Sequence, residues 1–206
     1  MFGFTQKEFK ILKRLNTPDR VQDFLSSIRM NLELNGDVLM SPRRVLREKQ
    51  AHCIEGALLA ATALWIQGRE PLLLDIQSTN DDYDHVVALF RENDRWGAIS
   101  KTNHGVLRYR EPVYRSYHEL AMSYFHEYFL QNGRKTMRAY SRPFNLKKFG
   151  EAWMTAEDDL WDIGHAIDAS PHIRVATPTT VKKFRKADPI EVRMGKIVEW
   201  KSRRRG

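Results

Sequence analysis

The chain has 206 residues, and its 42% hydrophobic and 11% aromatic content argues against a disordered protein. The formal net charge is +8, with part of the excess in a basic tail over residues 201–206, so acidic partners such as nucleic acid stay open. A single cysteine, Cys53, excludes a disulfide within the chain and a cysteine-based zinc cluster.

No apolar run approaches the ~18 residues of a membrane span, and the first ten residues lack the apolar centre of a signal peptide. A lone cysteine also suits a reducing compartment. We therefore expect a cytoplasmic protein without a membrane segment, and the sequence leaves its oligomeric state open.

The first fifty residues predict three helices, because each begins with a Ser or Thr that can cap a helix. In the first, Thr5 and Glu8 form a capping-box pattern. In the second and third, a proline follows the capping residue and presets the first turn. The expected helices cover residues 5–15, 17–36 and 41–50.

Residues 53–67 predict a helix that is apolar nearly all round, and therefore buried, with Gly68 at its end. Beyond it the pattern changes to short apolar runs separated by turn residues, which is typical of strands. The expected strands cover residues 71–78, 85–91 and 95–100, with an edge strand over 106–109. Helices followed by antiparallel strands indicate an α+β class.

The second half of the chain predicts mainly helices. They are expected over residues 117–131, 155–167, 179–185 and 189–200. We therefore expect residues 1–110 to form a core with N-terminal helices, and residues 111–206 to form a mainly helical extension packed on that core.

Cys53 stands at the expected start of the buried helix. Unpaired backbone N–H groups and the positive end of the helix dipole stabilise a thiolate there, so we expect its pKa to be lowered. A thiolate nucleophile needs a base, and His85 begins a strand that should lie across the helix. Because most lone cysteines are inert core residues, the hypothesis depends on this pairing with His85.

Residues 53–102 resemble the core of the transglutaminase-like superfamily, which has a papain-like fold. Members open a buried helix with Cys, continue with small and apolar residues and end at Gly, as the helix that begins at Cys53 does. A strand follows, here PLLLDI, then a strand that begins H-V, here HVVALF from His85, and a strand that begins with Trp, here Trp96. The preceding T-P-D-R-V-Q-D-F-L segment extends the resemblance over residues 17–102.

The resemblance implies acyl transfer, in which Cys53 attacks an amide carbonyl and His85 is the general base. Water then hydrolyses the acyl-enzyme, or a second amine accepts the acyl group. We expect hydrolysis, by a peptidase or amidase acting on a peptide or protein substrate, with no metal and no organic cofactor. The zinc-protease pattern H-E-x-x-H does not occur in the sequence.

The family completes a Cys-His-Asp triad with an aspartate about four residues after the Trp, and this chain has Ser100 there. A serine can orient an imidazole through a hydrogen bond but cannot stabilise the imidazolium by charge. Asn103 lies three residues on, and papain-type enzymes use Asn in this role. The third member is therefore Ser100 or Asn103, or the site is catalytically degenerate.

An oxyanion hole is also needed, and the backbone N–H of Cys53 is the expected first donor. Gln50 is either the second donor or a solvated residue at a helix end. Trp96 can wall the cleft or pack within its hairpin, and His104 can contact substrate or lie at a turn. His52 is expected to point away from Cys53.

Two alternatives to an enzyme stay open. Ser100 at the usual Asp position favours a transglutaminase-like binding module without activity. The net charge of +8 favours a basic nucleic-acid-associated protein, whose affinity would fall steeply with salt.

Overall fold

The structure, a computed structural model, describes residues 2–34 and 36–201. The helices are α1 (Gln6–Arg14), α2 (Pro18–Ser27), α3 (Pro42–Glu48), α4 (Cys53–Ile66), α5 (Tyr117–Met122), α6 (Trp161–Asp168), α7 (Pro178–Val181) and α8 (Pro189–Gly195), with short 3-10 turns η1 (Phe125–Glu127), η2 (Leu146–Phe149) and η3 (Ala152–Thr155). The strands are β1 (Arg29–Met30), β2 (Gln50–Ala51), β3 (Leu72–Gln77), β4 (His85–Glu92), β5 (Arg95–Ile99), β6 (Arg110–Tyr114), β7 (Ala139–Ser141), β8 (Phe144–Asn145) and β9 (His172–Arg174). None of the described helices is long and apolar enough to cross a membrane.

The three N-terminal helices begin where the capping residues predict them. The backbone N–H of Thr5 donates to the Glu8 carboxylate at 2.7 Å, and the backbone N–H of Glu8 donates to the Thr5 hydroxyl at 3.3 Å. The Ser41 hydroxyl accepts from the backbone N–H of Arg44 at 3.3 Å. The capping box of α1 and the serine cap of α3 are therefore confirmed.

Helix α2 ends at Ser27, well before the predicted end near residue 36. The Lys101 amine, from the segment after β5, lies 2.9 Å from the Leu25 carbonyl oxygen and 2.7 Å from that of Ile28. The chain then enters β1, which pairs in parallel with β2. Lys101 and strand β2 therefore take the backbone hydrogen bonds that a further turn of α2 would make. No residue within α2 indicates these distant partners.

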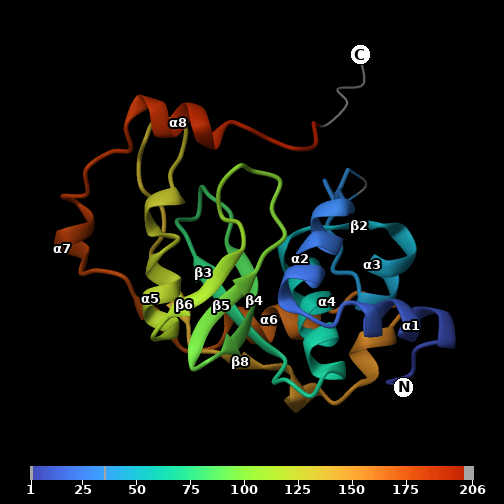
Figure 1. Ribbon diagram of the computed structural model, residues 1–206. Helices are drawn as coiled ribbons and strands as arrows, with labels where there is room; N and C mark the ends of the chain where they lie inside the picture. Colours follow the sequence, from blue (N-terminus) through green and yellow to red (C-terminus); the bar gives the residue numbers. More distant parts are fainter. Residues whose placement is uncertain (1, 35, 202–206) are drawn as a thin grey trace.

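Helix α4 is buried along most of its length and packs between the N-terminal helices and the sheet. Leu58 and Leu59 are 0% exposed and Leu64 is 1% exposed. Figure 1 shows α1–α4 together on one side of the sheet and α5 on the other. The prediction of a buried helix that opens with Cys53 is confirmed.

The described residues form a seven-stranded sheet in the order β6-β5-β4-β3-β7-β9, with β8 also paired to β3, and every pairing is antiparallel. Alternate residues of β4 enter two different cores. Val86 and Ala88 join the cluster around α4, whereas Val87 and Leu89 join the cluster under α5. Successive side chains of a strand point to opposite faces, and both faces of β4 are covered. This is why the residues from 86 onward form a continuous apolar run.

The turn between β4 and β5 fixes the register of the hairpin that carries His85. Asn93 and Asp94 have φ values of 48° and 60°, as a two-residue turn with both residues left-handed requires. Ala88 therefore pairs with Ile99, so that the start of β4 lies beside the end of β5. His85 and Ser100 are brought together by this register.

The second half differs from the predicted, mainly helical extension. Strands β7, β8 and β9 all join the sheet of the first half, so residues beyond 110 complete that sheet. The helix predicted over 117–131 ends at Met122, because the aromatic residues that follow turn under the sheet and fill its second core. Strands of two or three residues are too short to show an alternating pattern. Of the predicted basic tail, residues 202–206 lie outside the described chain.

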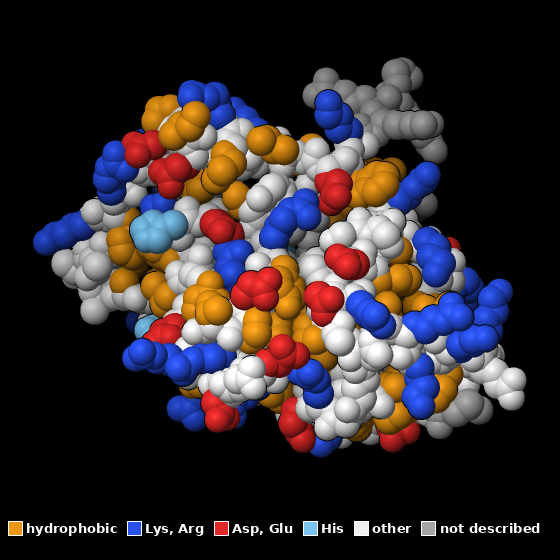
Figure 2. Space-filling model, viewed as in Figure 1, with side chains coloured by type: hydrophobic (Ala, Val, Ile, Leu, Met, Phe, Trp, Pro, Cys, Tyr) orange, Lys and Arg blue, Asp and Glu red, His pale blue; other side chains and the backbone are white. Residues whose placement is uncertain are grey.

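Surface charge is mixed on the face seen in Figure 2. Lys and Arg side chains gather towards the N-terminal helices at the right, and elsewhere Asp and Glu side chains interrupt them. Part of the positive charge is also paired, for example between Arg44 and Asp159 at 2.6 Å. The positive charge on this face of the described chain is therefore partly offset by neighbouring carboxylates.

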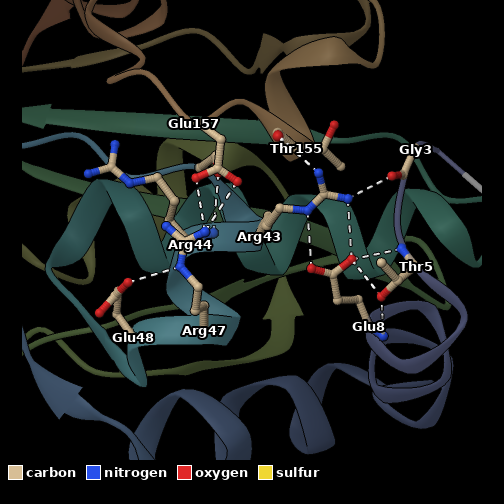
Figure 3. Close-up of polar contacts among 10 residues, drawn as sticks. Gly3, Thr5, Glu8, Arg43, Arg44, Arg47, Glu48, Thr155 and Glu157 are labelled. Carbon is tan, nitrogen blue, oxygen red and sulfur yellow. Dashed lines mark hydrogen bonds and ion pairs between the residues drawn. The ribbon is translucent and has the colours of Figure 1, made fainter.

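Arg43 ties helix α3, which leads into the site, to two other segments (Figure 3). Its guanidinium donates to Glu8 of α1 at 3.1 Å, to the Gly3 carbonyl oxygen at 2.7 Å and to the Thr155 carbonyl oxygen at 3.3 Å. Arg47, one turn further along α3, pairs with Glu157 at 2.9 Å but is about half exposed. The two arginines therefore differ in burial and in the number of backbone groups they bind.

We expect Arg43→Met to lower the free energy of unfolding by about 1–2 kcal/mol, because two carbonyl oxygens and a partly buried carboxylate lose their donor. The matched control Arg47→Met is expected to cost less than about 0.5 kcal/mol, as exposed ion pairs usually do. Urea unfolding of both variants measures the difference. Equal losses would contradict this account of the network.

Candidate active site

Cys53 is the first residue of α4, is half-buried and lines a cleft. The cleft has a volume of about 860 Å³, and His52 and His85 line it together with Cys53. The sulfur lies 4.0 Å from the backbone carbonyl oxygen of Asp84, the residue that precedes His85. The nucleophile and the base predicted from the sequence therefore share one cavity.

The hydrogen bonds of Ser100 determine which nitrogen of His85 carries a proton. The Ser100 hydroxyl donates to the carbonyl oxygen of Leu107 at 2.5 Å, so its proton is not available to the histidine. His85 Nε2 lies 2.8 Å from the same hydroxyl oxygen and must therefore donate to it. Nδ1 is then the nitrogen left free to exchange a proton in the cleft, which is the tautomer that a base for Cys53 requires.

Ser100 is itself fixed by a side chain that the sequence reasoning missed. Gln22 of α2 accepts from the Ser100 backbone N–H at 2.9 Å and donates to the Ser100 carbonyl oxygen at 2.9 Å. The Gln22 amide thus pairs with the backbone N–H and carbonyl oxygen of Ser100 as a neighbouring strand would, just after the end of β5. Helix α2 therefore contributes to the orientation of His85 through Ser100.

A second group of residues holds Leu107, the acceptor for Ser100. Leu107 has a φ of 59°, a left-handed conformation that is strained for a leucine. Its backbone N–H donates to Glu127 at 2.6 Å, and Glu127 pairs with Arg110 at 2.7 Å. Arg110 in turn stacks on Tyr124, whose ring contacts His85 edge-on with centroids 6.5 Å apart. Residues 107–127 thus support the imidazole indirectly through Ser100 and directly through the Tyr124 ring.

His52 does not point away from the site as the sequence reasoning expected. It is the N-cap of α4 and lines the cleft, with Nε2 3.0 Å from the carbonyl oxygen of Val38. Its backbone N–H donates to the Glu55 carboxylate at 2.8 Å, which is one half of a capping box. The prediction placed residue 52 inside the helix, where its side chain would point away from Cys53. His52 is instead the N-cap, and its extended backbone directs the side chain into the cleft.

The surroundings of Cys53 favour its thiolate. Burial alone raises the pKa of the thiol, but hydrogen bonding from the side chains of His52 and His85, and the positive charge of both rings, outweigh it. The net result is a pKa well below that of an ordinary cysteine. The helix start adds unpaired backbone N–H groups in the same place.

Two of the other predicted site residues, Asn103 and His104, line the cleft. Asn103 lines the cleft, but its amide binds the backbone N–H and carbonyl oxygen of Trp200, both at 2.8 Å, instead of His85. His104 also lines the cleft, with Nδ1 3.1 Å from the Gly195 carbonyl oxygen. His104 therefore holds the end of α8 beside the cleft, and Asn103 holds the segment after α8.

Gln50 and Trp96 lie outside the cleft. Gln50 belongs to β2 and lines a neighbouring cavity with Arg29 and Trp200. Trp96, on β5, packs edge-on against Tyr117 with centroids 6.2 Å apart. Their predicted roles as an oxyanion donor and a cleft wall therefore have no geometric support. Within residues 2–34 and 36–201, no group of three or more His, Cys, Asp or Glu side chains is placed to hold a metal ion.

Comparison of the chain with known protein families finds no match, and comparison with curated proteins finds no similar sequence.

Proposed function

We propose that the protein is a transglutaminase-like cysteine hydrolase that cleaves an amide or peptide bond through an acyl-enzyme on Cys53. The observation that carries the proposal is the pairing, in one cleft, of a half-buried cysteine at a helix start with an imidazole of fixed tautomer. Nucleophile, base and orienting group are the parts that this chemistry requires. Ser100 is the orienting group in this proposal.

The reaction proceeds in two steps. The Cys53 thiolate attacks the carbonyl carbon, and the C–N bond breaks as His85 Nδ1–H gives its proton to the departing amine, which leaves a thioester. His85, now neutral, takes a proton from water, and the hydroxide formed attacks the thioester. The C–S bond breaks, the acid is released, and the thiolate and the imidazolium are restored.

The Cys53 backbone N–H at the start of α4 is the proposed donor to the oxyanion in both steps. Gln50, predicted as the second oxyanion donor, lies outside the cleft, and the proposal assigns that role to no other side chain. The cleft of about 860 Å³ lies at the upper end of volumes for small-molecule sites, so a peptide segment is the proposed substrate class.

The second candidate function is a binding module that retains the fold without turnover. Ser100 favours it, because a hydroxyl that donates to a backbone carbonyl orients His85 but gives its imidazolium no compensating charge. A reactive thiol without hydrolysis would distinguish this candidate from the enzyme.

The experiment is the reaction of the protein with p-nitrophenyl acetate, followed by release of nitrophenolate and by intact mass. We expect one acetyl group per chain on Cys53 and continued turnover after the first equivalent, with both lost in Cys53→Ala. Labelling without turnover would favour the binding module. Equal release by wild type and Cys53→Ala would refute the enzyme.

A further inference from the structure

His52 is surrounded by oxygen atoms at one end of its ring. Nε2 lies 3.0 Å from the Val38 carbonyl oxygen, 3.5 Å from Glu33 and 3.6 Å from Glu55. All three neighbours are acceptors, so Nε2 must carry a proton. Nδ1 is then the nitrogen that remains for the adjacent Cys53, which lines the same cleft.

Glu55 supplies a buried negative charge beneath this ring. It is 0% exposed, and its oxygens accept from the backbone N–H groups of Met40 at 2.9 Å and His52 at 2.8 Å. The Asn31 amide donates to it at 3.2 Å. Because every one of these neighbours is a donor, the geometry fits the ionised carboxylate, although burial raises its pKa.

A buried carboxylate needs a compensating positive charge. Among the described residues, His52 is the ion-pair partner of Glu55, and it is also the partner of the half-buried Glu33. Glu33 is held in turn by the backbone N–H of Val38 at 3.2 Å. Two carboxylates from different segments therefore converge on one imidazole next to the nucleophile.

We propose that His52 is the counter-ion of the Cys53 thiolate, an imidazolium held between that thiolate and the carboxylates of Glu33 and Glu55, while His85 alone transfers protons. Only the role left to His85 rests on the proposed acyl transfer. The two imidazoles thus divide between them the tasks that a single histidine performs in a simple Cys-His pair.

The protonation of His52 supports this division. Burial lowers its pKa, but the hydrogen bond and charge of Cys53, the charge of Glu55 and the Val38 carbonyl outweigh burial and raise the pKa to about 10. A group with that pKa is deprotonated in roughly one molecule in a thousand at pH 7. Such a group can hold a charge in place, but it is a poor proton donor to a departing amine.

The test is the pH dependence of Cys53 alkylation by iodoacetamide, which needs a thiolate but no acyl transfer. In His52→Gln, where the amide can still donate to the Val38 carbonyl, we expect the alkylation rate at pH 6 to fall about 10-fold and its midpoint to rise by about two units. His85→Ala is expected to move the midpoint less while losing acetyl turnover. The exposed His165→Ala on α6 is the control and should match wild type.

A His52→Gln profile that superimposes on wild type, or a larger midpoint shift in His85→Ala, would overturn the proposal. Should His52→Gln not fold, Glu33→Gln carries the test, because Glu33 is partly exposed and glutamine keeps the acceptor for Val38. We expect its rate at pH 6 to fall about threefold, and an unchanged rate would overturn the proposal. Absence of acetyl turnover in wild type would refute the proposed hydrolase. The proposed role of His52 would still be tested by the alkylation profiles.

Discussion

His85→Ala is expected to lower the turnover of p-nitrophenyl acetate by about 10²–10⁴-fold, because the variant loses the group that takes a proton from water. The loss should fall mainly on hydrolysis of the thioester, so acetylated Cys53 should accumulate. Initial acetylation should continue, since His52 still stabilises the thiolate. Stopped-flow release of nitrophenolate, with intact mass at intervals, separates the two steps.

A second variant of the site and one control make the His85 result specific. Ser100→Ala removes the acceptor for His85 Nε2 without removing the ring, and we expect turnover to fall about 10-fold. His165→Ala, on the surface of α6, should leave turnover unchanged. Turnover in His85→Ala above a third of the wild-type rate would mean that another group is the base.

Gly56→Ala is expected to lower the free energy of unfolding by about 1–3 kcal/mol, although alanine normally favours a helix interior. A Cβ at residue 56 would lie 2.4 Å from the Lys101 Cβ, which is a clash. The Lys101 side chain cannot swing aside, because its amine binds the carbonyl oxygens of Leu25 and Ile28. Helix α4 must therefore shift, and urea unfolding measures the cost.

Gly164→Ala in α6 is the matched control. Its Cβ would meet only the Leu39 Cδ1, at 3.0 Å, which is the end of a flexible side chain. We expect a change of less than about 1 kcal/mol in either direction. Since α4 begins with Cys53, the alkylation rate should also change in Gly56→Ala and not in Gly164→Ala. Equal stability of the two variants would contradict the close contact between α4 and Lys101.

The sequence predicted the parts of the fold that depend on local rules. The caps at Thr5 and Ser41 and the apolar helix from Cys53 each depend on neighbouring residues alone. The early end of α2 and strands β7 to β9 depend on partners distant in the chain. No pattern within those segments could indicate them.

The candidate site was predictable to a similar extent. Cys53 and His85 were found because their positions at element starts are visible in sequence. His52 was missed because its role depends on whether it is the cap or the first helical residue, a difference of one position. The H-C-I-E pattern, with Glu55 three residues after His52, carried the signal, since it has the acidic half of a capping box. Gln22 carried no signal, because it acts only through contact with Ser100 in the folded chain.

The most direct test of the account is the pH dependence of Cys53 alkylation by iodoacetamide in the wild-type protein. A free cysteine reacts with a midpoint near pH 8.5, about its pKa. The pKa of Cys53 is lowered by His52 and His85, so the thiolate should persist as the pH falls below neutrality. We predict a rate that stays level from pH 8 to about pH 6. A midpoint at or above about 8.5, or a thiol that does not react, would contradict a Cys53 nucleophile.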